Sequence, residues 1–251
     1  MRTTIFNLPV DILSHEETVR SAIDAMEKGQ RRQHVALNVA KLVMARTDPE
    51  LEQNIRASDI VGIDGMGIVY ALRLLGYDVP ERVAGADLFD SLMAECARRQ
   101  LRPFLLGASP TVLEEAVRRL QRRHAGLRFA GTHHGYFPSE REEEVCSVIR
   151  ASGAHCLFVA MPTPRKERFV NRFRDRMSVP FIMGIGGTLD VTAGQVRRAP
   201  VLVQKVGLEW AFRMVQEPRR LAWRYLRTNS VFAALLLRQL VSRWAGSAAR
   251  S

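Results

Sequence analysis

Short apolar runs alternate with longer amphipathic stretches along most of the chain. The apolar runs are rich in β-branched and aromatic residues and occupy 34–38, 59–63, 103–107, 128–131, 156–160 and 180–186. The stretches between them have the apolar spacing of helices and cover 15–29, 39–57, 66–76, 87–100, 110–124, 138–151 and 164–176. This alternation predicts an α/β fold in which helices cover both faces of a mainly parallel sheet.

Polar residues and glycines stand where several of these strands are predicted to end. Ligands of open α/β sheets bind beyond the carboxyl ends of the strands, so these positions are the candidate site. Asn38 ends the first run, and Asp64 follows the second, with Gly65 and Gly67 opening the next helix. The carboxylate of Asp64 is typical of a general base and equally of a helix N-cap, and its position leaves both interpretations open.

Two glycine-containing turns are candidates for holding a phosphate. Gly107 and Ser109 precede Pro110 at a predicted helix start, although a serine N-cap explains the same residues. The turn Gly184–Asp190 follows the last predicted strand. Neither is a P-loop or a convincing dinucleotide-binding fingerprint. The sequence also has no D-x-D motif, which disfavours a divalent-metal mechanism.

Two further segments combine unusual residue types. His133 and His134 are adjacent and cannot point the same way from a strand or helix, so we expect at most one of them to contact a ligand. The segment Met161–Arg168 places several cations at a predicted helix start, where they oppose the helix dipole. That conflict indicates anions nearby, with a plain surface turn as the alternative.

The formal charge is strongly positive and uneven. The net charge of the 251 residues is +11, but the last 55 residues hold eleven Lys/Arg against two acidic residues, and all three tryptophans. Arginine and tryptophan on apolar helical segments are typical of a helix at an anionic membrane surface. A helix packed on the core with a solvated basic face and a nucleic-acid-binding tail are the other readings, although no base-reading motif is present.

Other features narrow the class of protein. The three cysteines form no C-x-x-C or Cys/His cluster, which argues against a disulfide framework or a zinc site and fits a reduced cytosol. The N-terminus has no long apolar run, so we expect no secretory signal. The apolar run 231–237 is too short to cross a bilayer, which needs about 20 residues.

A series of motifs together resembles a known family. They are N-x-x-K-L-V (38–43), S-D-I-V-G-I-D-G-M-G (58–67), E-R-V-A-G-A-D-L (81–88), G-T-H-H-G-Y-F (131–137), P-R-K-E-R (164–168) and G-I-G-G-T-L-D-V-x-A-G (184–194), followed by R-A-P, G-L-E-W and Q-E-P-R-R. From about Phe6 to Leu226, the chain resembles the WecG/TagA/CpsF glycosyltransferases, also called glycosyltransferase family 26.

The resemblance implies a Rossmann-like catalytic domain, 1–196, and a basic helical C-terminal appendage, 197–251, that binds membranes. It implies an inverting transfer, without metal or other cofactor, from a UDP-sugar to a polyprenyl-diphosphate-linked acceptor. Members build bacterial surface polymers and exopolysaccharides, which places the protein peripherally on the cytoplasmic face of the inner membrane. The donor sugar is not determined, and homo-oligomer formation stays open.

The resemblance also suggests roles for individual residues. The family's catalytic aspartate falls on Asp64, as base for the acceptor hydroxyl. The family often has Thr where Ala36 stands and Gln where Lys166 stands, which indicates a subgroup with a different donor or acceptor. The expected substrate-binding residues are Asn38, Gly65, Arg82, Gly107, His133, Lys166, Glu167, Gly186, Gly187, Thr188, Arg213, Arg220 and Arg224.

Two hypotheses from other classes compete with this one. A basic nucleic-acid-binding module would need aromatic residues interleaved with basic ones on its strands, and the predicted strands lack them. A Rossmann-type oxidoreductase is disfavoured by the missing dinucleotide fingerprint.

Overall fold

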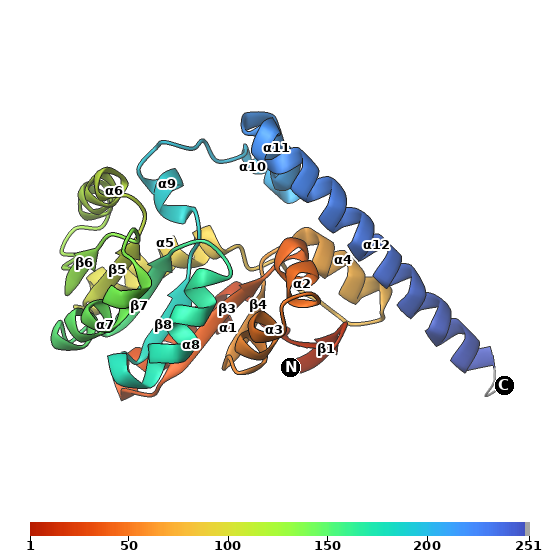
Figure 1. The fold of residues 1–251 in the computed structure, drawn as a ribbon, viewed down its shortest axis with the longest axis horizontal. Coiled ribbons are helices and arrows are strands. Elements are labelled where there is room, and N and C mark those ends of the chain that lie inside the picture. Colours follow the sequence, from red (N-terminus) through yellow and green to blue (C-terminus); the bar gives the residue numbers. More distant parts are fainter. Residues whose placement is uncertain (249–251) are drawn as a thin grey trace.

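Six parallel strands form the central sheet. The computed structural model describes residues 1–248, apart from the side chains at 201, 205, 220 and 243–248. In it the strand order is β4-β3-β8-β7-β5-β6 (Figure 1). The strands are β3 (Arg32–Leu37), β4 (Ile60–Ile63), β5 (Pro103–Gly107), β6 (Gly131–His133), β7 (Cys156–Ala160) and β8 (Phe181–Gly184). The predicted α/β class with a mainly parallel sheet is confirmed.

Helices cover both faces of the sheet. Consecutive strand residues point to opposite faces, so Phe158 of β7 joins one core and Val159 joins another. The first core packs against α1, α5 and α6, and the second against α7 and α8. The helices up to residue 192 are α1 (His15–Lys28), α2 (Val39–Ala45), α3 (Pro49–Arg56), α4 (Met66–Leu74), α5 (Gly85–Arg99), α6 (Pro110–Arg123), η1 (Ser139–Arg141), α7 (Glu142–Ala151), α8 (Arg165–Met177) and α9 (Thr188–Thr192).

Two predicted elements differ from the structure. The single helix predicted over 39–57 is two helices, because the Asp48 side chain accepts from Leu51 N at 3.0 Å and Pro49 begins α3. A capping carboxylate followed by proline restarts a helix rather than continuing one. The strand predicted over 128–131 is instead Gly131–His133.

An N-terminal hairpin was not predicted. Strands β1 (Arg2–Ile5) and β2 (Leu8–Asp11) are antiparallel. Phe6 and Asn7 at the turn have φ of 47° and 69°, the positive values that a two-residue hairpin turn of type I′ requires at both central positions. Asp11 Oδ2 accepts from Val61 N at 2.7 Å, which fixes the hairpin beside β4.

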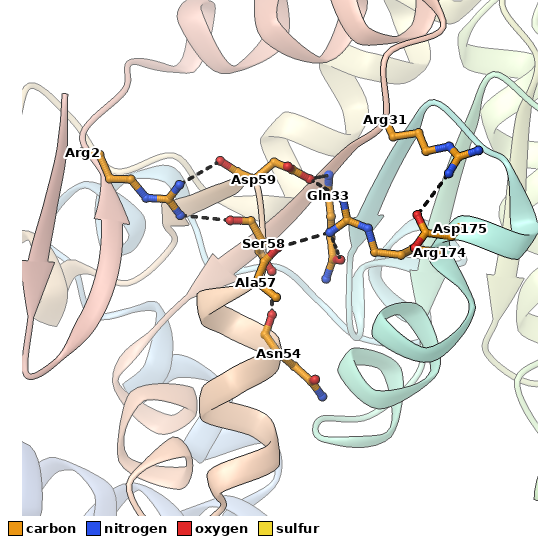
Figure 2. Close-up of polar contacts among 9 residues, drawn as sticks. All are labelled: Arg2, Arg31, Gln33, Asn54, Ala57, Ser58, Asp59, Arg174 and Asp175. Atoms are coloured by element: carbon orange, nitrogen blue, oxygen red, sulfur yellow. Dashed lines mark hydrogen bonds and ion pairs between the residues drawn. The ribbon is translucent and has the colours of Figure 1, made fainter.

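A polar network closes the amino ends of β3 and β4 (Figure 2). Asp59 Oδ2 accepts from Gln33 N at 2.8 Å and from Arg174 Nη2 of α8 at 3.0 Å. Arg2 of the hairpin donates to the Ser58 carbonyl at 3.0 Å. These contacts join the hairpin, the sheet and α8 at the end of the sheet opposite to the candidate site.

Three helices follow residue 200. They are α10 (Val201–Lys205), α11 (Glu209–Gln216) and α12 (Pro218–Ala248). Phe232 of α12 is 7% exposed, and its ring meets that of Phe6 edge-on at 5.7 Å. Leu235, Leu236 and Leu240 pack on the same apolar cluster, so α12 contacts the hairpin side of the body as it runs past α2 (Figure 1).

Two sequence expectations concern cysteines and membrane spans. Cys96, Cys146 and Cys156 are buried free thiols. Over the part of the chain that the structure describes, no helix combines the length and the apolar character needed to traverse a bilayer.

Candidate functional site

Asp64 lies at the carboxyl end of β4 and is held by two backbone contacts. Its amide donates to the Leu37 carbonyl of β3 at 3.0 Å, which continues the strand pairing. Its Oδ1 accepts from Gly85 N, the first amide of α5, at 2.8 Å. Ala84 gives α5 no side-chain cap, so Asp64 supplies the acceptor from another element. The helix that follows Asp64 is capped at Gly65, so this carboxylate is not the N-cap of its own helix.

Asn38 stands beside Asp64 at the end of the neighbouring strand. Its Oδ1 accepts from Lys41 N at 3.0 Å and so caps α2. A Cβ on Gly65 would lie 3.2 Å from the Asn38 Cβ. The ends of β3 and β4 therefore approach closely here, and the structure brings Asn38, Asp64 and Gly65 together.

A buried histidine lies under this strand end. Gly62 and Asp64 point to the same face of β4, and a Cβ on Gly62 would meet His34 Nε2 at 2.5 Å. His34 is 2% exposed, and neither ring nitrogen has a hydrogen-bond partner within the described residues. Burial, assisted by the Lys41 charge and opposed by Asp64, lowers the pKa of His34 to about 4. The ring is therefore neutral at pH 7. Sequence reasoning missed His34, although a glycine two residues before Asp64 was a signal of close packing.

Lys166 and Glu167 belong to a buried group of charges. Glu167 Oε1 contacts Lys41 Nζ at 2.9 Å and Lys166 Nζ at 3.1 Å, and it accepts from the Thr163 hydroxyl at 3.2 Å. Lys166 Nζ also donates to Thr163 Oγ1. The pKa of Glu167 falls to about 2 because the two lysines outweigh its burial. Burial, together with Lys41, lowers the pKa of Lys166 to about 8.

This charge group lines a small pocket between the sheet and α8. A Cβ on Gly184 would lie 2.9 Å from Lys166 Cε, so the missing side chain makes room for the lysine stem. The pocket is bounded by residues of β3, β8, α2 and α8, which are Gln33, His34, Val35, Lys41, Lys166, Glu167, Val170, Ile182 and Gly184.

The other cations at the start of α8 also have acceptors within the protein. Arg165 donates to the Phe137 carbonyl, and Arg168 pairs with Asp48 at 3.0 Å and Glu50 at 2.8 Å. The conflict with the helix dipole is therefore offset by carbonyl and carboxylate groups of this chain.

The turn after β8 lies next to the end of β3. Gly186 has φ of +51°, and Gly187 caps the short helix α9. The Thr188 hydroxyl donates its proton to the Ile185 carbonyl at 2.6 Å, so this proton is used within the turn. Because β8 and β3 are neighbours, this turn and Asn38 share one stretch of the sheet edge.

Gly107 and His133 lie at the other side of the sheet. A Cβ on Gly107 would be 2.6 Å from the Ala160 carbonyl, and its φ of +123° suits glycine. His133 Nδ1 contacts the His134 carbonyl at 2.7 Å. At about 4.8 Å per strand, β5 and β6 stand roughly 19 and 24 Å from β4. The structure does not bring these residues to Asp64.

The predicted arginines differ in their surroundings. Arg82 contacts the segment that follows residue 196. Arg82 Nη1 donates to Glu209 Oε2 at 2.9 Å. Arg213 is half-buried on α11, and Arg224 is exposed with its guanidinium 5.2 Å from the Tyr225 ring. The side chain of Arg220 lies outside the described residues.

Two further observations concern metal ligands and the protein family. In the described range 1–248, no group of three or more His, Cys, Asp and Glu side chains is placed to hold a metal ion. The family model described as "Glycosyl transferase WecG/TagA/CpsF family" matches residues 3–246, nearly the whole chain. With the resemblance of its motifs confirmed in this way, the chain belongs to the WecG/TagA/CpsF family of glycosyltransferases.

Proposed function

We propose that the protein transfers a sugar from a UDP-sugar to a polyprenyl-diphosphate-linked sugar, with inversion at the anomeric carbon. The observation that carries this proposal is the placement of Asp64. It stands at the carboxyl end of a parallel strand, where such sheets bind ligands, and the first amide of α5 fixes its Oδ1. A carboxylate positioned in this way suits a general base.

The reaction needs one displacement. The acceptor hydroxyl oxygen attacks the anomeric carbon, the bond from that carbon to the diphosphate oxygen breaks, and UDP leaves with the electron pair. The acceptor proton passes to Oδ2 of Asp64, since Gly85 already occupies Oδ1. Negative charge on the leaving UDP needs nearby cations, and arginine suits a diphosphate because its planar fork binds two oxygens at once. Arg82 is the first candidate for that contact, with Arg213, Arg220 and Arg224 from the C-terminal segment.

A second part of the proposal concerns the membrane. Trp223, Leu226, Leu237 and Val241 of α12 are 61–72% exposed. At 3.6 residues per turn they fall on one stripe, opposite the buried Leu221 and Phe232, of which Phe232 packs on the body. An apolar stripe flanked by exposed arginines is typical of an interfacial helix. We propose that this stripe of α12 lies on an anionic membrane, at the cytoplasmic face of the inner membrane where a polyprenyl acceptor would be embedded.

A release assay tests the proposed reaction. Purified protein is incubated with each of several UDP-sugars and a short polyprenyl-diphosphate-linked sugar, and free UDP is measured with and without the acceptor. We expect acceptor-dependent release with at least one donor. Release of UDP from no donor, or release that does not depend on the acceptor, would refute the proposal.

A further inference from the structure

Two ion pairs join the C-terminal segment to the neighbourhood of Asp64. Arg82 contacts Glu209 at 2.9 Å, with side chains 14% and 21% exposed. Arg198 donates to both oxygens of Asp87, at 2.5 and 2.7 Å. Arg82 lies just before α5 and Asp87 in its first turn, the part of the chain whose Gly85 amide holds the catalytic candidate. Both pairs therefore join the C-terminal segment to the stretch of chain that holds Asp64.

The two pairs differ in geometry. Arg198 and Asp87 form a forked contact through two nitrogens and two oxygens, which is the stronger arrangement. The hydrogen bonds from Arg198 are the main cause that lowers the pKa of Asp87, and Arg82 adds to it. Arg82 and Glu209 meet instead through one nitrogen and one oxygen, Nη1 and Oε2. The Arg198–Asp87 pair is therefore the one expected to persist, and the Arg82–Glu209 pair is the one that a ligand anion can replace.

Arg82 is also tied to the strand that carries Asp64. Its neighbour Val83 donates from its amide to the Ile63 carbonyl at 3.0 Å, one residue before Asp64. A guanidinium binds carboxylate and phosphate oxygens with the same fork. Because the backbone next to Arg82 lies beside the strand that ends at Asp64, a diphosphate bound to this arginine would occupy the same region of the sheet edge as Asp64.

We propose that Glu209 occupies on Arg82 the place that the donor's diphosphate takes during the reaction. The inference rests on the proposed use of a UDP-sugar. Donor binding then exchanges one oxyanion for another on Arg82 and releases the first residue of α11, while the Asp87–Arg198 pair keeps the segment attached. Glu209 is accordingly an internal competitor of the diphosphate and not a contact of the nucleoside.

Competition predicts opposite effects for the two partners. Replacing Glu209 with glutamine frees Arg82 from a carboxylate, so UDP binds about two- to fivefold more tightly. Replacing Arg82 with methionine removes charged hydrogen bonds to the phosphates and weakens UDP about 10- to 100-fold. Neither change affects uridine, which has no phosphate.

The test is calorimetric titration of the full chain with UDP and with uridine. The variants are Glu209→Gln, Arg82→Met and, as a matched control, Glu52→Gln, which breaks the exposed Glu52–Arg56 pair on α3. Thermal unfolding of each variant is measured alongside. We expect tighter UDP binding for Glu209→Gln alone, weaker UDP binding for Arg82→Met alone, and equal uridine binding throughout.

The other outcomes count against the inference in different ways. Unchanged UDP affinity in Glu209→Gln, with only a lower unfolding temperature, would make the pair a structural tether. Weaker binding of both UDP and uridine in Glu209→Gln would make Glu209 a nucleoside contact. If UDP does bind the wild type, either result overturns the competition and leaves the proposed function standing. If neither the wild type nor any variant binds UDP, the proposal of a UDP-sugar donor fails, and this inference fails with it.

Discussion

The buried charges around Glu167 provide a sharp test of the structure. We predict that Glu167→Gln destabilises the protein by about 3–5 kcal/mol, the usual cost of removing one partner from a buried ion pair. The carboxylate faces Lys41 at 2.9 Å and Lys166 at 3.1 Å, and these side chains are only 7% and 9% exposed. An amide would leave two ammonium groups close together without the carboxylate that both of them contact. Urea unfolding followed by circular dichroism, extrapolated to water, measures the loss.

A second substitution separates charge from packing. In Lys166→Met/Glu167→Gln only one uncompensated ammonium remains, so we expect the double variant to recover about 1–2 kcal/mol relative to Glu167→Gln. The control Glu16→Gln breaks the exposed Arg20–Glu16 pair on α1 and should cost at most about 0.5 kcal/mol. A loss below about 1 kcal/mol in Glu167→Gln, or no recovery in the double variant, would refute the buried-charge account.

The same charges give a pH dependence with a definite sign. The folded pKa of Glu167 is about 2 against an ordinary 4.5, so its contribution is present above pH 4.5 and is lost as the pH falls toward 2. The difference in stability between wild type and Glu167→Gln should therefore shrink over that window. Lys166 has a folded pKa of about 8 against 10.5, so its unfolded form binds more protons and stability gains from this group as pH rises from 8 to 10.5. A stability difference that stays constant from pH 5 to pH 3 would contradict the Glu167 assignment.

Two further predictions concern other parts of the molecule. Asp59→Asn should lower the free energy of unfolding in urea by about 1–3 kcal/mol, because Asp59 accepts from Gln33 N and Arg174 (Figure 2). The control Asp175→Asn, on an exposed pair with Arg31, should cost under about 0.5 kcal/mol. Equal losses would show that the Asp59 contacts stabilise the fold no more than an exposed ion pair. Leu226→Glu/Leu237→Glu should lower sedimentation with anionic vesicles at least about tenfold, since it places two charges on the proposed membrane stripe. Val148→Glu, on the exposed face of α7, serves as control, and unchanged sedimentation of the α12 variant would rule the stripe out as the contact.

Local patterns were enough to predict much of the fold. Apolar runs placed five of the six strands well, because strands buried on both faces are apolar throughout, whereas the polar edge strand β6 overlaps its predicted range only at Gly131. Asp48 and Pro49 indicate a new helix start between α2 and α3. The apolar spacing over 39–57 continues across this break, and it led to the prediction of a single helix. The hairpin at residues 2–11 was missed because its turn depends on positive φ at Phe6 and Asn7, where no glycine marks it.

The candidate site was predictable only in part, because it depends on which strand ends are neighbours. The order β4-β3-β8 brings Asp64, Asn38 and the turn at Gly186 together, and the same order leaves Gly107 and His133 at the other side of the sheet. Spacing along the chain does not reveal strand order. Contacts over long sequence separation, such as Lys41 with Glu167 and Arg82 with Glu209, likewise follow from the tertiary arrangement alone.

The central claim is that Asp64 is the base of a sugar transfer, and its most direct test is the turnover of Asp64→Asn. The asparagine carbonyl can still accept from Gly85 N, so the fold should persist with a loss in stability under about 1 kcal/mol. The variant cannot take the acceptor proton. With the UDP-sugar and lipid acceptor that support wild-type turnover, we predict that kcat for UDP release falls about 10²- to 10⁴-fold. Release within about threefold of the wild-type rate, from a folded variant, would contradict the account.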